Sequence, residues 1–289
     1  FAIKGRIKGA FTAAFIIAAI NCADAGRVMS RFITFEDYNR FVARDNAIAS
    51  AIRNAGGIKR CLNFEQAFGP NRNIYYGIES LRGMHGLMPS DYMEMEKAGV
   101  FGNIQVNRLF NITHYLSDRE MAVPGIEKVY ESSGIILYMD TLAKNRVFFA
   151  GSLRKAGSKK QALDIMKQGF DGSYSIAEPD FPMGEYGLRQ GSVSVTSYSP
   201  NRVAAVVESA EGGAVVHASA YYSEWKAKID GRNTPVYRVN YMSMAVQAPP
   251  GRHEIEFYYD DSSTRTGIFL LLTGVLILTG AAFASRRAG

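Results

Sequence analysis

The sequence has few of the residues that build disulfides, metal sites and catalytic centres. Its 289 residues include two cysteines, four histidines and one tryptophan. Cys22 lies inside an apolar run, which leaves Cys61 without a disulfide partner. His114, His217 and His253 are isolated, with no second ligand at metal-binding spacing. We therefore expect no metal site and no bound cofactor in this chain, which also lacks Ser-His-Asp, P-loop and dinucleotide motifs.

Net charge is scarce in the middle of the chain. The formal charge is +6, from 33 Lys+Arg against 27 Asp+Glu. Five basic residues at the two ends supply +5 of this charge: Lys4, Arg6, Lys8, Arg286 and Arg287. The residues between the two ends therefore carry a net charge of only +1. The interior has no basic helix and no arginine–aromatic stripe, so we expect no nucleic-acid partner.

A long uncharged run lies near the end of the sequence. From Thr266 to Ser285 there are 20 residues without a charge, TGIFLLLTGVLILTGAAFAS, and two arginines follow. As a helix this run is about 30 Å long, the thickness of the hydrocarbon core of a bilayer. Its glycines are typical of membrane helices, in which small residues allow close helix contacts. We predict that residues 264–289 form a transmembrane helix with a cytoplasmic Arg-Arg tail.

A shorter uncharged run, from Gly9 to Ala23, allows two interpretations. As a helix it is about 22 Å long, and it spans a bilayer if Lys8 extends to the interface. Alternatively, the basic start, the apolar stretch and Ala23-Asp24-Ala25 describe a cleavable signal peptide. Because the chain begins with Phe, we favour part of a larger protein in which residues 1–26 form the last-but-one span.

The two basic ends set the expected orientation in the membrane. Positively charged flanks of membrane helices stay on the cytoplasmic side. We therefore expect both termini in the cytoplasm and residues 27–265 outside it. The lipid bilayer is the first partner that the sequence predicts.

Residues 27–180 have the mixed pattern of an α+β region. A capping box at Thr34 and Asp37 and helical spacing of apolar residues predict a first helix that ends at Gly56-Gly57. Two more helices are expected at 89–98 and, capped by Ser158, at 159–168. Short strands are expected at 58–63, 106–110, 113–117, 128–131, 135–140 and 146–149.

Residues 181–263 have a different, purely strand-like pattern. Seven short alternating segments are separated by turn signals such as Asp230-Gly231 and Pro249-Pro250-Gly251. Regular spacing of that kind predicts an antiparallel β-sandwich. The expected fold is therefore an α+β extracytoplasmic region followed by an antiparallel β-sandwich, flanked by two transmembrane helices.

One glycine-rich loop gathers polar side chains that suit ligand binding. The stretch from Gly77 to Asp91, GIESLRGMHGLMPSD, holds Glu79, Arg82, His85 and Asp91. A carboxylate, a guanidinium and an imidazole together suit a sugar or a diphosphate, with Arg82 pairing phosphate oxygens. The alternative is a docking loop whose polar groups satisfy one another.

Trp225, with Tyr221 and Tyr222 nearby, is the other candidate binding residue. Aromatic rings of this kind form stacking platforms for sugars. A single tryptophan between strands also serves as a core anchor, and the sequence leaves both interpretations open.

The C-terminal third of the sequence resembles the YfhO-type bacterial membrane proteins. The motif is an aromatic pair, Trp-Lys-Ala, an Asp-Gly turn, an Asn, a Pro-Gly-x-His turn and a final span. Its residues are Tyr221, Tyr222, Trp225, Lys226, Ala227, Asp230, Gly231, Asn240, Pro250, Gly251, His253 and Gly267. The resemblance covers about Asp24 to Ala284, and departures such as Ser223-Glu224 in place of the usual Pro-Gly mark a divergent member.

The family resembles GT-C glycosyltransferases, and this resemblance implies a function. It implies a protein of the bacterial cytoplasmic membrane that transfers sugar from a polyprenyl-phosphate donor to a cell-envelope glycan or lipid-linked acceptor. The catalytic carboxylate of such enzymes lies in an early loop, which would precede Phe1. No catalytic residue is therefore expected in this chain, which we expect to be inactive alone and to act beside an upstream transmembrane bundle.

The alternative function comes from a different class. A chain anchored at both ends is also the arrangement of a non-catalytic extracytoplasmic module that binds glycan or protein.

Overall fold

A computed structural model gives the fold of most of the chain. It describes residues 2–31, 46–55, 57–62, 69, 71–83, 88–132 and 134–287. Two units are distinguished, each described here by itself: Phe1–Arg44 with Asp261–Gly289, and Asp45–Asp260.

The first unit contains two long helices, α1 (Ala2–Met29) and α8 (Ser262–Arg287). Within them, Phe11–Met29 and Ser262–Gly280 are long and apolar enough to cross a membrane. Their polar side chains bond to their own helix: Asn21 Nδ2 donates to the carbonyl of Ile17 at 2.8 Å. The hydroxyl of Thr273 likewise donates to the carbonyl four residues earlier, at 2.8 Å. Such bonds satisfy polar groups where lipid offers no partner.

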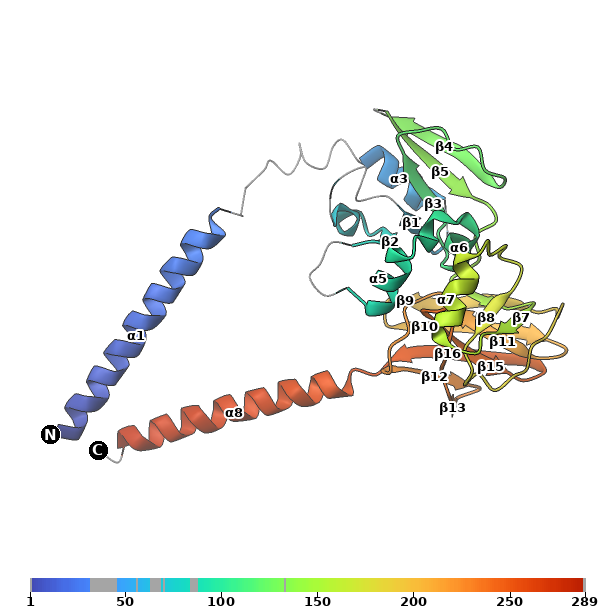
Figure 1. Cartoon of the computed structure of the whole chain (residues 1–289). Helices are drawn as coiled ribbons and strands as arrows, with labels where there is room; N and C mark the ends of the chain where they lie inside the picture. The colour runs from blue at the N-terminus through green and yellow to red at the C-terminus, as the bar shows by residue number, and fades with distance from the viewer. Residues whose placement is uncertain are drawn as a thin grey trace. The chain divides into compact units, whose positions relative to one another are not determined.

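The second unit begins with a five-stranded sheet and its helices. The strand order is β2 (Glu79–Ser80), β1 (Arg60–Leu62), β3 (His114–Ser117), β5 (Ile135–Asp140) and β4 (Ile126–Ser132). The helical segments are α3 (Asn46–Asn54), η1 (Arg72–Tyr76), α5 (Ser90–Lys97), η2 (Val100–Gly102), α6 (Ile104–Leu109) and α7 (Lys159–Lys167). In Figure 1, α6 lies next to this sheet, and α7 overlaps the remaining strands.

Two further sheets pack face to face as a β-sandwich. The inner sheet has the order β6 (Val147–Phe149), β11 (Gly213–His217), β15 (Ser243–Ala248), β14 (Tyr237–Val239), β8 (Ser175–Ala177) and β7 (Leu153–Lys155). The outer sheet has the order β13 (Arg232–Thr234), β12 (Trp225–Ile229), β16 (Gly251–Tyr259), β10 (Arg202–Ser209) and β9 (Ser192–Ser199). Among the described strands of the sandwich, all pairs are antiparallel except β7–β8. In the first sheet, β1 pairs in parallel with β2 and β3. The sandwich therefore includes strands from both sides of the expected boundary at residue 181.

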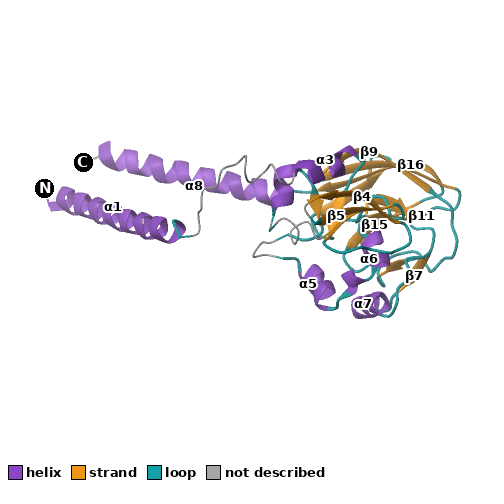
Figure 2. Ribbon diagram, turned by 90° about the horizontal axis from the view of Figure 1, so that it is seen from above, coloured by secondary structure: helices purple, strands orange, loops and turns teal. Residues whose placement is uncertain are grey.

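The inner sheet is buried on both faces, and this explains its sequence. Val215 on β11 belongs to the core between the two sandwich sheets, with Val246 on β15. Ala214 and Val216 point to the opposite face and join a second core, to which α5, α6 and α7 contribute. Because both faces are covered, β11 is a continuous apolar run and not an alternating one. Figure 2 shows the strands of this unit with α5, α6 and α7 grouped on one side.

The expected fold class is confirmed: an α+β region, an antiparallel sandwich and two apolar terminal helices. The cap predicted at Ser158 is confirmed, since its Oγ accepts from the amide of Gln161 at 3.2 Å at the start of α7; the capping box predicted at Thr34 and Asp37 lies outside the described residues. The first expected helix lies only partly within the described residues. Its end is α3, and positions 32–45 lie outside the described residues.

One expected strand is a helix. The segment 106–110 was predicted as a strand but lies largely in α6, which begins after Asn103. The Asn103 side chain accepts from the amide of Gln105 at 2.9 Å, an N-cap that the sequence analysis did not consider. Val106, Leu109 and Phe110 are all buried, and their i, i+3, i+4 spacing fits a helix in a core.

The side chain of His253, a residue of the family motif, links two turns of the outer sheet. We call its contacts with Asp230 and Pro250 the clasp. His253 Nδ1 lies 2.6 Å from Asp230 Oδ2, and Nε2 lies 3.0 Å from the carbonyl oxygen of Pro250. Both partners only accept hydrogen bonds, so the ring donates from both nitrogens only when it is protonated. The bond to Asp230 is the main cause that raises the pKa of His253. Gly251 has φ +116°, and a Cβ there would approach His253 Nε2 to 3.2 Å.

Asn240, another motif residue, joins two strands of the inner sheet. It is fully buried with φ 49°, and its side-chain oxygen accepts from the amide of Ile176 at 2.8 Å. Its own amide donates to the carbonyl of Ile176 at 2.7 Å. The asparagine therefore extends the ladder between β14 and β8 at a backbone conformation that this residue type tolerates.

Replacing His253 by glutamine should destabilise the protein more at about pH 6 than at about pH 9. The pKa of His253 is raised in the folded state by Asp230. Its contribution to stability is complete below the unfolded pKa and is lost as the pH rises through the folded pKa. Thermal unfolding of the whole chain in detergent at both pH values measures this, with Lys160→Gln on the exposed side of α7 as control. An equal loss at the two pH values would contradict the clasp.

Candidate functional site

A buried charge network forms around the carboxylate of Glu79. The parallel pairing of β2 with β1 sets Glu79 opposite Arg60. The carboxylate accepts from the guanidinium of Arg146 and from the hydroxyl of Tyr198, and Arg60 Nη2 lies 3.7 Å from its Oε2. Arg146 precedes β6 and Tyr198 lies on β9. Glu79 therefore joins the first sheet to both sheets of the sandwich.

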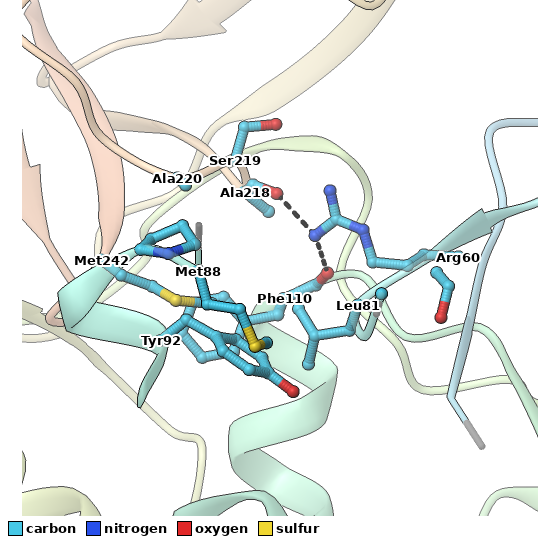
Figure 3. A pocket seen from close by; sticks show the side chains of 12 residues that line it. Arg60, Leu81, Met88, Tyr92, Phe110, Ala218, Ser219, Ala220 and Met242 are labelled. Carbon is cyan, nitrogen blue, oxygen red and sulfur yellow. Dashed lines mark hydrogen bonds between the residues drawn. The ribbon is translucent and has the colours of Figure 1, made fainter. Parts of the chain in front are cut away.

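Backbone carbonyls hold both arginines in place. Arg60 Nη1 donates to the carbonyls of Phe110 at 2.8 Å and Ala218 at 2.9 Å, as Figure 3 shows. Arg146 Nη1 donates to the same Ala218 oxygen at 3.3 Å, and its side chain is 0% exposed. Two guanidinium groups thus share one carboxylate, and the network has a net positive charge.

Burial controls the protonation of the network. It lowers the pKa of Arg60, and the nearby Glu79 partly offsets this. Burial, followed by the hydrogen bond to Glu79, raises the pKa of Tyr198, so its phenol stays neutral and donates.

A small apolar cavity lies on the other side of Arg60. It has a volume of about 180 Å³, and Figure 3 shows Arg60 at its wall facing apolar side chains. The main ones are Leu81, Met88, Tyr92 and Met242. The size suits one ring or a short aliphatic group, and the methionines make its shape adaptable.

A second charged cluster forms where α5, α7 and β14 meet. Asp91, in the first turn of α5, pairs with Lys159 Nζ at 2.6 Å and with Arg238 Nη1 at 3.4 Å. Lys159 also lies 3.7 Å from Glu94. Glu178 lies 4.0 Å from Arg238, and burial raises the pKa of its carboxyl. We call this set of carboxylates and cations the Asp91 cluster.

Tyrosine rings line the Asp91 cluster. Lys159 Nζ lies 4.8 Å from the centroid of the Tyr241 ring, and Arg238 Cζ lies 4.8 Å from that of Tyr221. The neighbouring Tyr222 is 44% exposed. Burial raises its pKa, and Tyr259 and Asp91 raise it further. Carboxylates and guanidinium groups bond to sugar hydroxyls, and exposed rings stack on sugar faces.

The residues of the glycine-rich loop do not gather at one point. Glu79 belongs to the network with Arg60, Arg146 and Tyr198, and Asp91 belongs to the Asp91 cluster. Arg82 pairs with Glu96 at 2.5 Å. His85 lies outside the described residues. Trp225 is 7% exposed and packs edge-on against His217 in the sandwich core, which is the core position that the sequence left open.

Sequence reasoning missed the partners of Glu79 and Asp91 because they are distant in the chain. Arg146 is 67 residues and Tyr198 is 119 residues from Glu79. Lys159 is 68 residues from Asp91. No local motif marks such pairs, and only the fold brings them together.

A serine and a histidine lie close together, but their surroundings suit a structural role. Ser219 Oγ lies 3.1 Å from His217 Nε2. Burial lowers the pKa of His217 to about 3, so its ring is neutral and a weak base. It packs on Trp225 and Phe257. In the described part of the chain, no three His, Cys, Asp or Glu side chains form a group that could hold a metal ion.

Replacing Glu79 by glutamine should cost about 2–3 kcal/mol of unfolding free energy, because it leaves buried Arg146 without its carboxylate. The loss is below that of a fully buried pair, since the Glu79 side chain is 35% exposed. Glu96→Gln is the matched control and should cost less than about 1 kcal/mol, because its pair with Arg82 is partly exposed. Denaturant unfolding of the whole chain compares them; equal losses would contradict the central role of Glu79.

Comparison with known proteins gives a family match to one part of the chain. The model of a family described as bacterial membrane protein YfhO matches residues 186–271. No curated protein and no solved structure matches the sequence. The matched segment runs from just before β9 into α8 and contains the motif residues on which the resemblance rests. The match covers 86 of the 289 residues, and this segment of the chain is similar to the YfhO-type bacterial membrane proteins.

Proposed function

We propose that this chain is the C-terminal part of a membrane glycosyltransferase and positions the glycan or lipid-linked acceptor. The full-length protein would act in glycosylation of the cell envelope, with a polyprenyl-phosphate sugar as donor. The family match and the two apolar terminal helices support a membrane protein. In this proposal residues 27–265 are extracytoplasmic, both termini are cytoplasmic, and an upstream transmembrane bundle carries the catalytic residue.

The observation that carries the proposal is the composition of the Asp91 cluster. Three carboxylates, of Asp91, Glu94 and Glu178, surround two cations that are only partly exposed. Charged groups that already hold one another in place offer acceptors and donors in fixed directions, as polyhydroxylated ligands require.

The exposed ring of Tyr222 complements these polar groups. Its face offers an apolar surface of the kind that sugar C–H groups contact, and the preceding residue, Tyr221, packs on Arg238 of the cluster. A surface that combines ring stacking with charged hydrogen-bond partners favours a sugar over a purely apolar or a purely ionic ligand.

The cluster suits binding better than bond cleavage. Its carboxylates pair with cations, and Glu94 also accepts from the hydroxyl of Tyr241. Such pairing holds these carboxylates in place and occupies their oxygens, whereas a general acid needs an open position next to its substrate. Acceptor positioning is therefore assigned to this chain, and the transfer step to upstream residues.

Replacing Tyr222 by alanine should raise the acceptor KM of the full-length protein about tenfold, with a smaller change in kcat, because a stacking surface is lost. Sugar transfer in membranes from a polyprenyl-phosphate sugar donor measures both constants. Tyr75→Ala is the matched control, since Tyr75 is also exposed, at 66%, but lies on η1 outside the cluster.

Unchanged acceptor KM in Tyr222→Ala would overturn the placement of the acceptor at this surface. Glycan binding by a full-length protein that transfers no sugar would overturn the transferase proposal and favour a non-catalytic binding module anchored at both ends.

A further inference from the structure

A groove follows β9, the strand at one edge of the outer sheet. The order of that sheet places β10 on one side of β9 and, among the described strands, none on the other. The groove has a volume of about 470 Å³ and is lined by six consecutive residues of the strand, 193–198. Its opposite wall includes Gly57, Ile58 and Asn145. We call it the β9 groove.

The backbone of β9 offers hydrogen-bond partners to this groove. In an antiparallel pair, alternate residues direct their amide and carbonyl groups to the neighbouring strand, and the residues between them direct theirs away from it. Because β9 pairs with β10 over 192–199, about half of its backbone groups point to the other edge, which the groove follows. Six strand residues extend over about 20 Å, enough for ladder bonds with a short extended chain.

The core of the sandwich is open at the same edge. Val193 and Val195 of β9 belong to this core but remain partly exposed. Their partners on β10, Val207 and Ala205, are 1% and 3% exposed. A further strand beside β9 would place its inward side chains next to the two valines and cover them. Apolar burial would then add to the backbone bonds.

The sequence of β9 has few of the features that protect the edges of sheets. The strand is SVSVTSYS, with no charge, no proline and no glycine. At the opposite edge of the sheet, β13 has only three residues and includes Arg232. Edge strands are commonly short, or carry charges or prolines that prevent pairing with another chain. An eight-residue neutral edge is instead a suitable template for an added strand.

A bulge in β9 limits the kind of partner that can pair with it. The register between β9 and β10 shifts between Ala204 and Ala205, so Thr196 is an extra residue in β9. A bulge bends its strand, and a bent edge pairs poorly with the edge of another folded sheet. The opposite wall of the groove also restricts the approach of a whole domain. A single flexible segment can follow the bend and enter between the two walls.

We propose that the β9 groove binds an extended segment of another polypeptide, which pairs with β9 as an additional strand. Backbone bonds supply the affinity, and the groove selects the side chains that fit. Apart from Arg146, whose side chain is buried, the lining residues are uncharged. The segment that fits therefore has small or β-branched uncharged side chains. The site is separate from the Asp91 cluster and does not depend on the proposed transferase activity.

The test measures the binding of a fluorescein-labelled hexapeptide of alternating serine and valine to the whole chain in detergent, by fluorescence anisotropy. The peptide should bind, and the same peptide with N-methyl groups on its third and fourth amides should bind about tenfold more weakly. Those two amides face opposite edges of an extended chain, so methylation blocks pairing at either edge. The bound peptide should also slow the hydrogen exchange of residues 192–199.

A variant that fills the groove separates it from the rest of the surface. Asn145 is exposed on the wall opposite β9, and Asn145→Trp should weaken peptide binding about tenfold because the indole occupies the space. The matched control is Asn233→Trp, at an exposed position of β13 on the other edge of the same sheet, which should leave binding unchanged. Tyr222→Ala should also bind the peptide normally, which separates this groove from the acceptor surface.

Three results of the binding assay would overturn the proposal: no peptide binding, equal binding of the methylated peptide, or an equal loss in the two tryptophan variants. Unchanged hydrogen exchange of residues 192–199 in the bound state would also overturn it. Sedimentation of the whole chain as a dimer that Asn145→Trp dissociates would assign the groove to a second copy of the chain, and the proposal would then be wrong.

Discussion

The carboxylate of Glu79 contacts side chains from three sheets, and the arrangement of the second unit depends on it. Arg60 comes from the first sheet, Arg146 leads into the inner sandwich sheet, and Tyr198 lies on the outer one. A charge held this way specifies how the layers fit together, because a shifted layer would leave a buried guanidinium unpaired. The hydrophobic cores alone tolerate small shifts much better.

The inner sheet of the sandwich has a matching role in packing. Because it is covered on both faces, its two charged clusters lie at its borders with other layers. The Asp91 cluster forms where α5 and α7 meet β14, and the Glu79 network forms where Arg146 leads into β6. Both combine side chains from distant parts of the chain on a rigid support, the usual location of binding sites in layered folds.

The fold could be predicted from the sequence to a large extent, because strand alternation and helix caps are local signals. Strands at 135–140 and 192–199 and the cap at Ser158 follow from such signals. The helix at 106–110 could not be predicted from such signals, because a short apolar run fits the period of a strand and that of a helix. The N-cap at Asn103 determines that this segment is helical. The site was less predictable: Glu79 and Asp91 were identified, but Arg146 and Lys159, which pair with them, lie more than sixty residues away. The motif residues Asn240 and His253 have structural roles that only their contacts explain.

Trp225 gives the protein one further property. It is the only tryptophan in the chain, and its indole is buried between the sandwich sheets, edge-on to His217 and Tyr259. The indole fluorescence of the chain therefore comes from one place, the interior of the sandwich. Its emission should be blue-shifted while the sheets are closed, and water entering between them would shift it to the red. The residue that anchors this core is also a natural optical probe of its integrity.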